Sequence, residues 1–306
     1  MDLFDSKAIS PMLLEVKKQP FDDENYIFEL KLDGIRCIAY LDKDKTYLRN
    51  KRNKELVDIY PELKNIHEQA KKKCILDGEL VVLNPDGSPN FMLLQKRSLL
   101  SDPLKIEFES EKHKVHFVAY DILYLDSESL TGRPLIERKQ LLEKNIKEND
   151  DLSISRYIEG QGIKLFNLTK KLKLEGIVAK EKNSTYEIGK RSKNWIKIKN
   201  LIDEDLNICG LKLDENNNIK DLVLCEKVKN GYKYRGKVFL NISKEEQKII
   251  LAFALKNPLK KPLFSSNSDK DIIWIKPTLV CTIEYMMLTK DGMMRQPVFK
   301  ALRDDK

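Results

Sequence analysis

The order in which strand-like and helix-like segments follow one another most limits the fold of this chain. Residues 74–83 and 115–124 alternate apolar and polar side chains with the period of two that is typical of β-strands. Helices are predicted between and after these strands, at 91–97, 133–146 and 162–173. Strands and helices in this mixed order favour an α+β domain, built of mixed antiparallel sheets and helices, over a regular βαβ winding.

The sequence changes character after Lys199. Residues 200–205 are polar and charged, so we expect a linker there. Short strands are predicted beyond it, at 206–213, 221–227, 232–242, 272–275 and 279–288. Ser243, followed three residues later by Glu246, has the form of a capping box and predicts the start of a helix. This pattern fits an all-β OB-fold domain at 203–306 after a first domain at 1–202.

Length and composition permit two domains, each with its own core. The chain has 306 residues, of which 41% are hydrophobic. Its net charge of +8 is compatible with a polyanionic partner without requiring one. The first residues lack the pattern of a signal peptide and no apolar run approaches membrane-spanning length, so we expect a cytoplasmic protein without a membrane partner. The five cysteines lie far apart with no Cys-x-x-Cys pair, which indicates reduced thiols.

One lysine after an early strand is the strongest candidate for a reactive group. Residues 26–30 are rich in aromatic and β-branched types, and Asp33-Gly34 predicts a turn, so Lys31 lies near a strand end. An ordinary lysine, with a pKa of about 10.4, is a free amine only about once in a few thousand molecules at pH 7. Attack by Lys31 therefore needs nearby cations and partial desolvation. Chance alone produces a Lys-x-Asp-Gly tetrad about 0.1 times in such a chain, so its weight depends on later segments.

Two strand segments carry carboxylates that suit a cation. Asp77 and Glu79 lie two residues apart, and so on one face of a strand, where they need a cation or a proton between them. Glu175 opens a predicted strand at 175–180. An exposed strand face or a solvated acid explains each of these residues when it is taken alone.

The densest run of positive charge is 190–199. Lys197 and Lys199 share one face of a predicted strand, with Trp195 among their apolar neighbours. Two lysines aimed together can neutralise a phosphate and favour the free amine of Lys31. A solvated basic face is the alternative.

These segments occur in an order that resembles the covalent nucleotidyltransferases, specifically the ATP-dependent DNA ligases. The matching segments are 29–36, 48–50, 77–79, 120, 175–180, 190–199, 274–277 and 303–306. The chain is most similar to the ligase module of bacterial ligase D, which acts in non-homologous end joining, DNA repair and recombination. The resemblance runs from Pro11 to Lys306 and implies a nucleotidyltransferase (adenylation) domain before the OB fold. It leaves no room in these residues for polymerase, phosphoesterase or separate DNA-binding modules.

The resemblance implies that Lys31 takes AMP from ATP as a covalent nucleophile, while Lys197 and Lys199 stabilise charge on the phosphate. The other implied nucleotide contacts are Glu29 to the adenine amine, Arg36, Glu79 at the ribose or the metal shell, Tyr120 stacked on adenine, Lys180 beside the phosphates, and Arg303 and Lys306 at the β and γ phosphates. By base rate Tyr120 also suits a core aromatic. Because the terminal residues must approach ATP and later withdraw for DNA, a hinge is expected near 200–204.

The metal and the DNA also have implied ligands. Asp33, Glu79 and Glu175 would hold Mg²⁺ or Mn²⁺, which prefer oxygen ligands. Arg49 and Arg191 would meet the 5′-phosphate of nicked or broken duplex DNA. The expected protein is a nucleoid-associated monomer, and a Ku-type end-binding protein is the candidate partner.

Three other classes of protein compete with this reading. An RNA ligase or an mRNA capping guanylyltransferase shares the lysine tetrad, although Glu29 and the regions of Trp195 and Arg295 favour ATP and DNA. The NAD-dependent DNA ligases carry a four-cysteine zinc module, which the cysteine spacing does not match. A non-catalytic nucleotide- or DNA-binding scaffold is the third alternative, against which the intact Lys31 and its charged neighbours argue.

Overall fold

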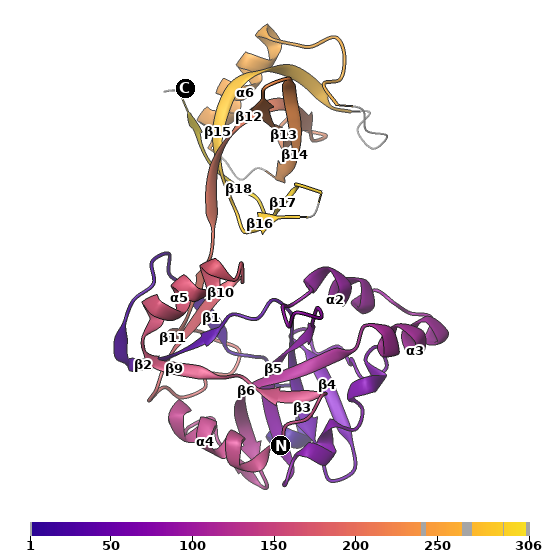
Figure 1. Ribbon diagram of the computed structural model, residues 1–306, viewed down its shortest axis with the longest axis vertical. Helices are drawn as coiled ribbons and strands as arrows, with labels where there is room; N and C mark the ends of the chain where they lie inside the picture. Colours follow the sequence, from indigo (N-terminus) through magenta and orange to yellow (C-terminus); the bar gives the residue numbers. More distant parts are fainter. Residues whose placement is uncertain (1, 240–242, 265–270, 290, 304–306) are drawn as a thin grey trace. The chain divides into compact units, whose positions relative to one another are not determined.

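The chain divides into two compact units, 1–200 and 201–306, and each is described by itself (Figure 1). The computed structural model describes residues 2–239, 243–264, 271–289 and 291–303. The division falls two residues before the boundary expected from the sequence.

One sheet of the first unit has five strands. Their order is β1 (Leu13–Val16), β11 (Arg191–Lys199), β10 (Gly176–Glu181), β2 (Asp23–Leu30) and β9 (Tyr157–Gly160). All neighbours are antiparallel except β1 and β11, which run parallel. Helix α5 (Gly162–Lys171) packs on one face, where Phe166 joins Phe28 and Ile198 in a buried cluster (Figure 1). The other face, which carries Glu29, turns toward the second sheet.

The second sheet is built around two long strands. Its order is β4 (Thr46–Asn50), β3 (Ile35–Leu41), β5 (Cys74–Val82), β6 (Val115–Leu125) and β7 (Glu128–Ser129), with β8 (Leu152–Ile154) paired in parallel to β6. One core cluster joins the two sheets, because it contains Ile27 and Trp195 from the first and Ile38, Ile75 and Leu123 from the second. The candidate site residues lie along this junction.

The three predicted helices of the first unit are confirmed within a few residues. They are α2 (Phe91–Ser98), α4 (Leu135–Asn145) and α5. The sequence did not predict α3 (Pro103–Lys112), the short α1 (Leu3–Ser6) or the 3₁₀ turns η1 (Pro61–Leu63) and η2 (Ile66–Gln69). Helix α3 buries only Ile106, so its apolar periodicity is weak, and its start depends on the Asp102 cap and Pro103 at the first helical position.

The second unit has the OB fold. Its main sheet has the order β14 (Gly231–Phe239), β13 (Ile219–Val228), β12 (Ile202–Leu213), β15 (Ile273–Tyr285) and β18 (Val298–Arg303), and β16 (Met287–Leu288) pairs with β17 (Met294–Arg295). Helix α6 (Lys244–Lys256) follows β14, and the predicted capping box of Ser243 and Glu246 is confirmed. The strands expected at 272–275 and 279–288 are instead a continuous β15 followed by β16. Pro277 is tolerated because the register with β12 shifts at that level.

The expected linker at 200–205 is mostly strand, so that prediction was wrong. Ile202 pairs with Tyr285 and Asp205 with Thr282, which makes these residues the start of β12. Asn200 donates through its side chain to the carbonyl of Leu174 at 2.8 Å and belongs to the first unit. Two of the polar residues that suggested a linker have side-chain partners on other strands of the sheet: Glu204 pairs with Arg235 and accepts from Tyr285, and Asp205 accepts from Thr282 and Arg303.

All five cysteines are free and buried. Across the described ranges, no helix is both long and apolar enough to cross a membrane.

Candidate active site

Two glycines bring the segment after β2 against its neighbours. The backbone N–H of Lys31 donates to the carbonyl of Gly176 at 2.9 Å, which ties the lysine to β10. Gly34 lies against β5, where an added Cβ would be 2.2 Å from the carbonyl oxygen of Leu80. The turn can therefore approach β5 only because residue 34 has no side chain.

A carboxylate joins two of the predicted lysines. Glu175 accepts from Lys31 Nζ at 2.8 Å through Oε2 and pairs with Lys199 Nζ at 3.1 Å through Oε1. The Glu175 side chain is 5% exposed, while the two lysines keep 21% and 23% of their side-chain surfaces open to water. Gly176 permits this approach, since its φ is +142° and a Cβ there would lie 2.1 Å from Ile198 O. The structure thus brings together Lys31, Glu175 and Lys199, three of the residues that the sequence singles out.

Lys197 adds a further positive charge to this group. It lies two residues before Lys199 on β11 and opposite Val178 of β10. Burial lowers the pKa of Lys197, and the charges of Lys199, Lys31 and Arg191 lower it further. The site therefore gathers the positive charges of Lys31, Lys197 and Lys199 near the carboxylate of Glu175, an arrangement that suits a phosphate-bearing ligand.

The paired carboxylates of β5 have different environments. Asp77 is fully buried and accepts from Arg36 at 3.0 and 2.6 Å and from the Tyr186 hydroxyl at 2.7 Å. Burial raises the pKa of Glu79 to about 8, helped by the charges of Asp77 and Glu175 and opposed by those of Lys31 and Arg36. Glu79 thus faces the lysine group, whereas Asp77 belongs to an internal ion pair.

Arg36 was predicted to contact the nucleotide, but the structure places it in that internal pair. Besides its fork to Asp77, it donates to the carbonyl of Met12 at 2.6 Å. Its guanidinium carbon lies 5.6 Å from the centre of the Tyr120 ring. Its observed contacts are those of a residue that joins β3 to β5 and to the segment before β1.

A second charged cluster lies deeper in the junction between the sheets. Glu29 is 2% exposed, and its two oxygens pair with Lys139 at 2.6 Å and Lys180 at 2.9 Å. Ser155 Oγ donates to the same carboxylate at 3.2 Å. Burial alone would raise the pKa of Glu29, but the charges and hydrogen bonds of the two lysines outweigh it and lower the pKa. Glu29 is therefore ionised at neutral pH.

Lys180, which the resemblance places beside the phosphates, lies further along β10 than the group around Lys31. Four residues of strand separate it from Gly176, a distance of about 13 Å at roughly 3.3 Å per residue. Its ammonium instead lies 4.4 Å from the ring centre of Tyr120 and 4.1 Å from that of Trp195. Burial lowers the pKa of Lys180, and the charge of Lys139 adds to this effect. Lys180 belongs to the Glu29 cluster.

Tyr120 occupies a β-bulge, which explains how a strand residue can turn toward the junction. Asp77 pairs with Asp121 and Gly78 with Ala119, so Tyr120 is the extra residue of β6. Its ring meets Trp195 edge to face, with 6.2 Å between centroids. The Tyr120 side chain is half-buried, so it is compatible both with a core aromatic residue and with a ring that stacks on adenine.

The three predicted metal ligands do not form a ready-made site. In the described part of the chain, no group of three or more His, Cys, Asp or Glu side chains is placed to hold a metal ion. Both oxygens of Glu175 are instead occupied by lysines. Asp33 and Glu79 therefore do not join Glu175 as a preformed set.

The remaining predicted residues have protein partners. Arg49 pairs with Glu55 at 2.9 Å, and Arg191 donates to the carbonyl of Leu14. Arg303 of the second unit donates to Asp205 at 2.8 Å. Lys306 lies outside the described residues.

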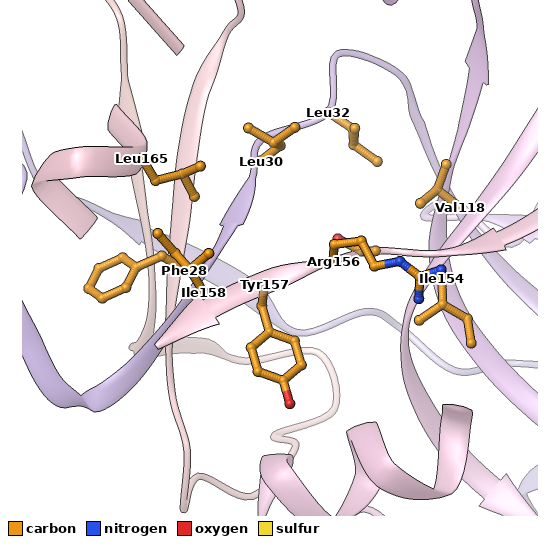
Figure 2. A pocket seen from close by; sticks show the side chains of 10 residues that line it. Phe28, Leu30, Leu32, Val118, Ile154, Arg156, Tyr157, Ile158 and Leu165 are labelled. Carbon is orange, nitrogen blue, oxygen red and sulfur yellow. The ribbon is translucent and has the colours of Figure 1, made fainter. Parts of the chain in front are cut away.

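A pocket of about 290 Å³ lies close to Lys31 but on the other face of β2. Figure 2 shows Leu30, Leu32 and Leu165 on one side of it and Ile158 on the other, while the ring of Tyr157 points away. Side chains alternate along a strand, so Phe28 and Leu30 face this pocket whereas Glu29 faces the opposite way. The pocket therefore lies on the opposite side of β2 from Glu29, although Ser155, whose hydroxyl donates to Glu29, also lines it.

The fold and this site define a class: a nucleotidyltransferase domain, with a lysine at the junction of two sheets, joined to an OB-fold domain. Family models agree with this class over most of the chain. Residues 11–199 match the ATP dependent DNA ligase domain, and residues 215–306 match the ATP dependent DNA ligase C terminal region. The chain belongs to the ATP-dependent DNA ligase family.

Two bacterial proteins are among the relatives of this chain. The SPbeta prophage-derived DNA ligase-like protein LigB of Bacillus subtilis is 32% identical, with 96% of this chain and 99% of that protein covered. The multifunctional non-homologous end joining DNA repair protein LigD of Mycobacterium tuberculosis is 30% identical over 92% of this chain but only 36% of its own length. The crystal structure of the ligase domain of M. tuberculosis LigD matches with a TM-score of 0.59 and 26% identity, covering 100% of this chain and 97% of that one.

Proposed function

We propose that this protein seals 5′-phosphate/3′-hydroxyl breaks in duplex DNA through a covalent AMP adduct on Lys31. The observation that carries the proposal is the placement of Lys31 Nζ 2.8 Å from Glu175, with Lys199 on the other carboxylate oxygen. In the first step the Lys31 nitrogen attacks the α-phosphorus of ATP, a P–N bond forms, and the bond to pyrophosphate breaks. Lys197 and Lys199 are the proposed partners of the charged phosphate oxygens in this step.

The two DNA steps transfer and then release the AMP. The 5′-phosphate oxygen of the break attacks the adduct phosphorus and frees Lys31. The 3′-hydroxyl then attacks the activated 5′-phosphate, the phosphodiester bond forms, and AMP leaves. Arg49 and Arg191 are the proposed 5′-phosphate contacts, and Arg303 and Lys306 the proposed contacts to the β and γ phosphates. Arg303 must leave Asp205 for that role.

Magnesium or manganese fits this donor set only as a partner of the nucleotide. Mg²⁺ is commonly held by one or two carboxylates together with substrate phosphates, so Glu175 and Glu79 are the proposed protein ligands, and Asp33, two residues after Lys31, is the third candidate. When bound, the metal would supply positive charge to the phosphate oxygens. Glu175 would have to exchange a lysine for the metal.

End joining is the proposed cellular role, because the LigD relatives are named for it. The chain spans about a third of those proteins, so their partners carry over only as proposals. The proposed partners of this chain are nicked or broken duplex DNA and a Ku-type end-binding protein. The chain itself is proposed to be a cytoplasmic, nucleoid-associated monomer.

Labelling with α-³²P-ATP tests the chemistry. Wild-type protein should retain label after denaturation, and Lys31→Ala should not. Lys72→Ala is the matched control, because Lys72 also pairs with a carboxylate, Asp126, at 2.9 Å but is largely exposed. A labelled adduct on Lys31→Ala contradicts the mechanism.

Substrate choice separates the proposal from its rivals. A capping-type enzyme would prefer GTP, and an RNA ligase would prefer nicked RNA to nicked DNA. A wild-type protein that forms no adduct with either nucleotide but still binds DNA would be a scaffold.

A further inference from the structure

Lys139 is a fully buried lysine that the reaction outlined above does not use. It lies on α4, and its ammonium donates to Glu29 Oε1 at 2.6 Å, to the carbonyl of Ser155 at 3.1 Å and to the carbonyl of Tyr120 at 3.3 Å. An ammonium has three donors, so each is satisfied. Burial of a lysine is costly unless its charge is paired, so this position is closely specified.

Each acceptor of Lys139 belongs to a segment that borders the proposed base site. Glu29 precedes Lys31 by two residues on the same face of its segment. The carbonyl of Tyr120 lies in the bulge of β6, where one residue is left over from the ladder. Ser155 contributes its carbonyl to Lys139 and its hydroxyl to Glu29. One ammonium thus fixes the carboxylate, the bulge and the chain before β9.

The helix that carries Lys139 is itself firmly held. The neighbouring Arg138 forms a fully buried fork to Asp121 with two bonds of 2.8 Å. Arg138 also donates to the carbonyl of Ser184 at 3.0 Å. Because α4 is anchored on both the bulged strand and the loop after β10, Lys139 has little freedom to move away from Glu29.

We propose that Lys139 is a positioning residue that sets which nucleobase the enzyme accepts, acting through the carboxylate of Glu29. The proposal rests on the proposed adenylylation of Lys31 and on Glu29 as the partner of the base. An ionised carboxylate only accepts hydrogen bonds, so it suits the 6-amino group of adenine and opposes the 6-oxo group of guanine. Each carboxylate oxygen offers about two acceptor sites, and Oε1 accepts one bond from the described residues, so a site remains for the base.

The charge of Lys139 supports this role. With Lys180, it outweighs the effect of burial and lowers the pKa of Glu29. If Lys139 were neutral, Glu29 would face Lys180 alone, lose its fixed orientation and more readily take up a proton. A protonated carboxyl group can donate to a 6-oxo group, so discrimination between the bases would weaken.

A cycle between a variant and a substrate analogue tests the proposal. Single-turnover adduct formation is measured for wild type and Lys139→Met with ATP, GTP and purine riboside triphosphate, which lacks the 6-amino group. With ATP, the apparent second-order rate constant should fall roughly tenfold to a hundredfold in the variant, the loss of a charge-assisted hydrogen bond. With purine riboside triphosphate the change should stay within about threefold, as should the maximal rate at saturating ATP.

Controls separate positioning from a general loss of structure. Arg97→Met removes another buried cation, which pairs with Glu62 at 2.8 Å in a different cluster, and should leave the ratio of ATP to purine riboside triphosphate unchanged. Ser155→Ala removes only the hydroxyl bond to Glu29 and should lower the ratio of the rate constants with ATP and purine riboside triphosphate severalfold. This variant tests the positioning of Glu29 if Lys139→Met does not fold. The proposal is overturned if folded Lys139→Met loses the same factor in rate constant with ATP and with purine riboside triphosphate, or if its ratio of the two rate constants equals that of the wild type. A wild-type protein without any adduct overturns the proposed function first.

Discussion

Gly176→Ala should disable adenylylation without removing any charged group. A Cβ at this position would lie 2.1 Å from the carbonyl oxygen of Ile198, and an ordinary contact begins near 3.4 Å, so β10 and β11 must part by about 1.3 Å. Gly176 accepts the backbone bond of Lys31 and follows Glu175, so this movement displaces the lysine from its carboxylate. A displacement of about 1 Å can cost roughly a hundredfold in rate.

The same substitution also strains the backbone. Its φ of +142° is a conformation that side chains rarely adopt, and such strain costs about 1–3 kcal/mol. Gly87→Ala is the matched control in the same unit, because Gly87 has a φ of +79° with nothing within 4 Å of an added Cβ. The control should lose some stability and keep the wild-type rate.

Two measurements on each variant decide the outcome. Single-turnover adduct formation gives the rate, and urea unfolding gives the stability of the first unit. The chain has two tryptophans, so unfolding is followed in a Trp274→Phe background in which Trp195 reports on the first unit. A Gly176→Ala protein that forms the adduct at the wild-type rate would refute the reasoning, as would an equal loss of rate in Gly87→Ala.

Four further outcomes are expected. Arg138→Met leaves Asp121 buried without its cation and should cost about 3–5 kcal/mol in urea unfolding; a loss below 1 kcal/mol contradicts this. Glu79 has a pKa near 8 in the folded protein and about 4.5 in the unfolded chain, so between these values the folded state binds the extra proton. The stability of the wild type, relative to Glu79→Gln, should therefore fall as pH rises from about 5 to 8; a difference in stability that does not change with pH argues against this prediction. Ser243→Ala should lower the stability of the second unit by about 1 kcal/mol, read from Trp274 in a Trp195→Phe background, with no change meaning that the cap is unimportant. Leu201→Pro should alter adenylylation and the sealing of pre-adenylylated nicks by different factors, and equal rates would exclude a hinge there.

Much of the fold follows from local sequence patterns. Helix α5 has a strongly one-sided apolar pattern, and Ser243 with Glu246 carries a capping signal in four residues. Helix α3 was not predicted because it buries a single side chain. The strand predicted at 206–213 is shorter than the observed β12 because the first residues of β12 are polar. Their polarity is balanced by partners on β15 and β18, such as Thr282 and Arg303, which lie far away in the sequence.

The site divides in the same way. The lysine tetrad and the two lysines of β11 follow from motif order, and the structure brings Lys31 and Lys199 to one carboxylate. Lys139 carries no signal, because a lysine in an amphipathic helix ordinarily faces water. Its partner Glu29 lies 110 residues away, so only the packing of α4 against both sheets reveals the pair. The pairing of Lys180 with Glu29 is likewise visible only in the fold, because the two residues are 151 positions apart.

The burial of all five thiols has a practical consequence. Maleimide dyes react with accessible thiolates, and burial raises the pKa of Cys281 to about 12 while shielding the sulfur from reagent. The native protein should therefore tolerate labelling conditions with its own cysteines in place. One new surface cysteine in each unit, for example at Lys72 and Lys227, would then accept a donor and an acceptor fluorophore. Energy transfer between them could follow the two units through each step of a single sealing event.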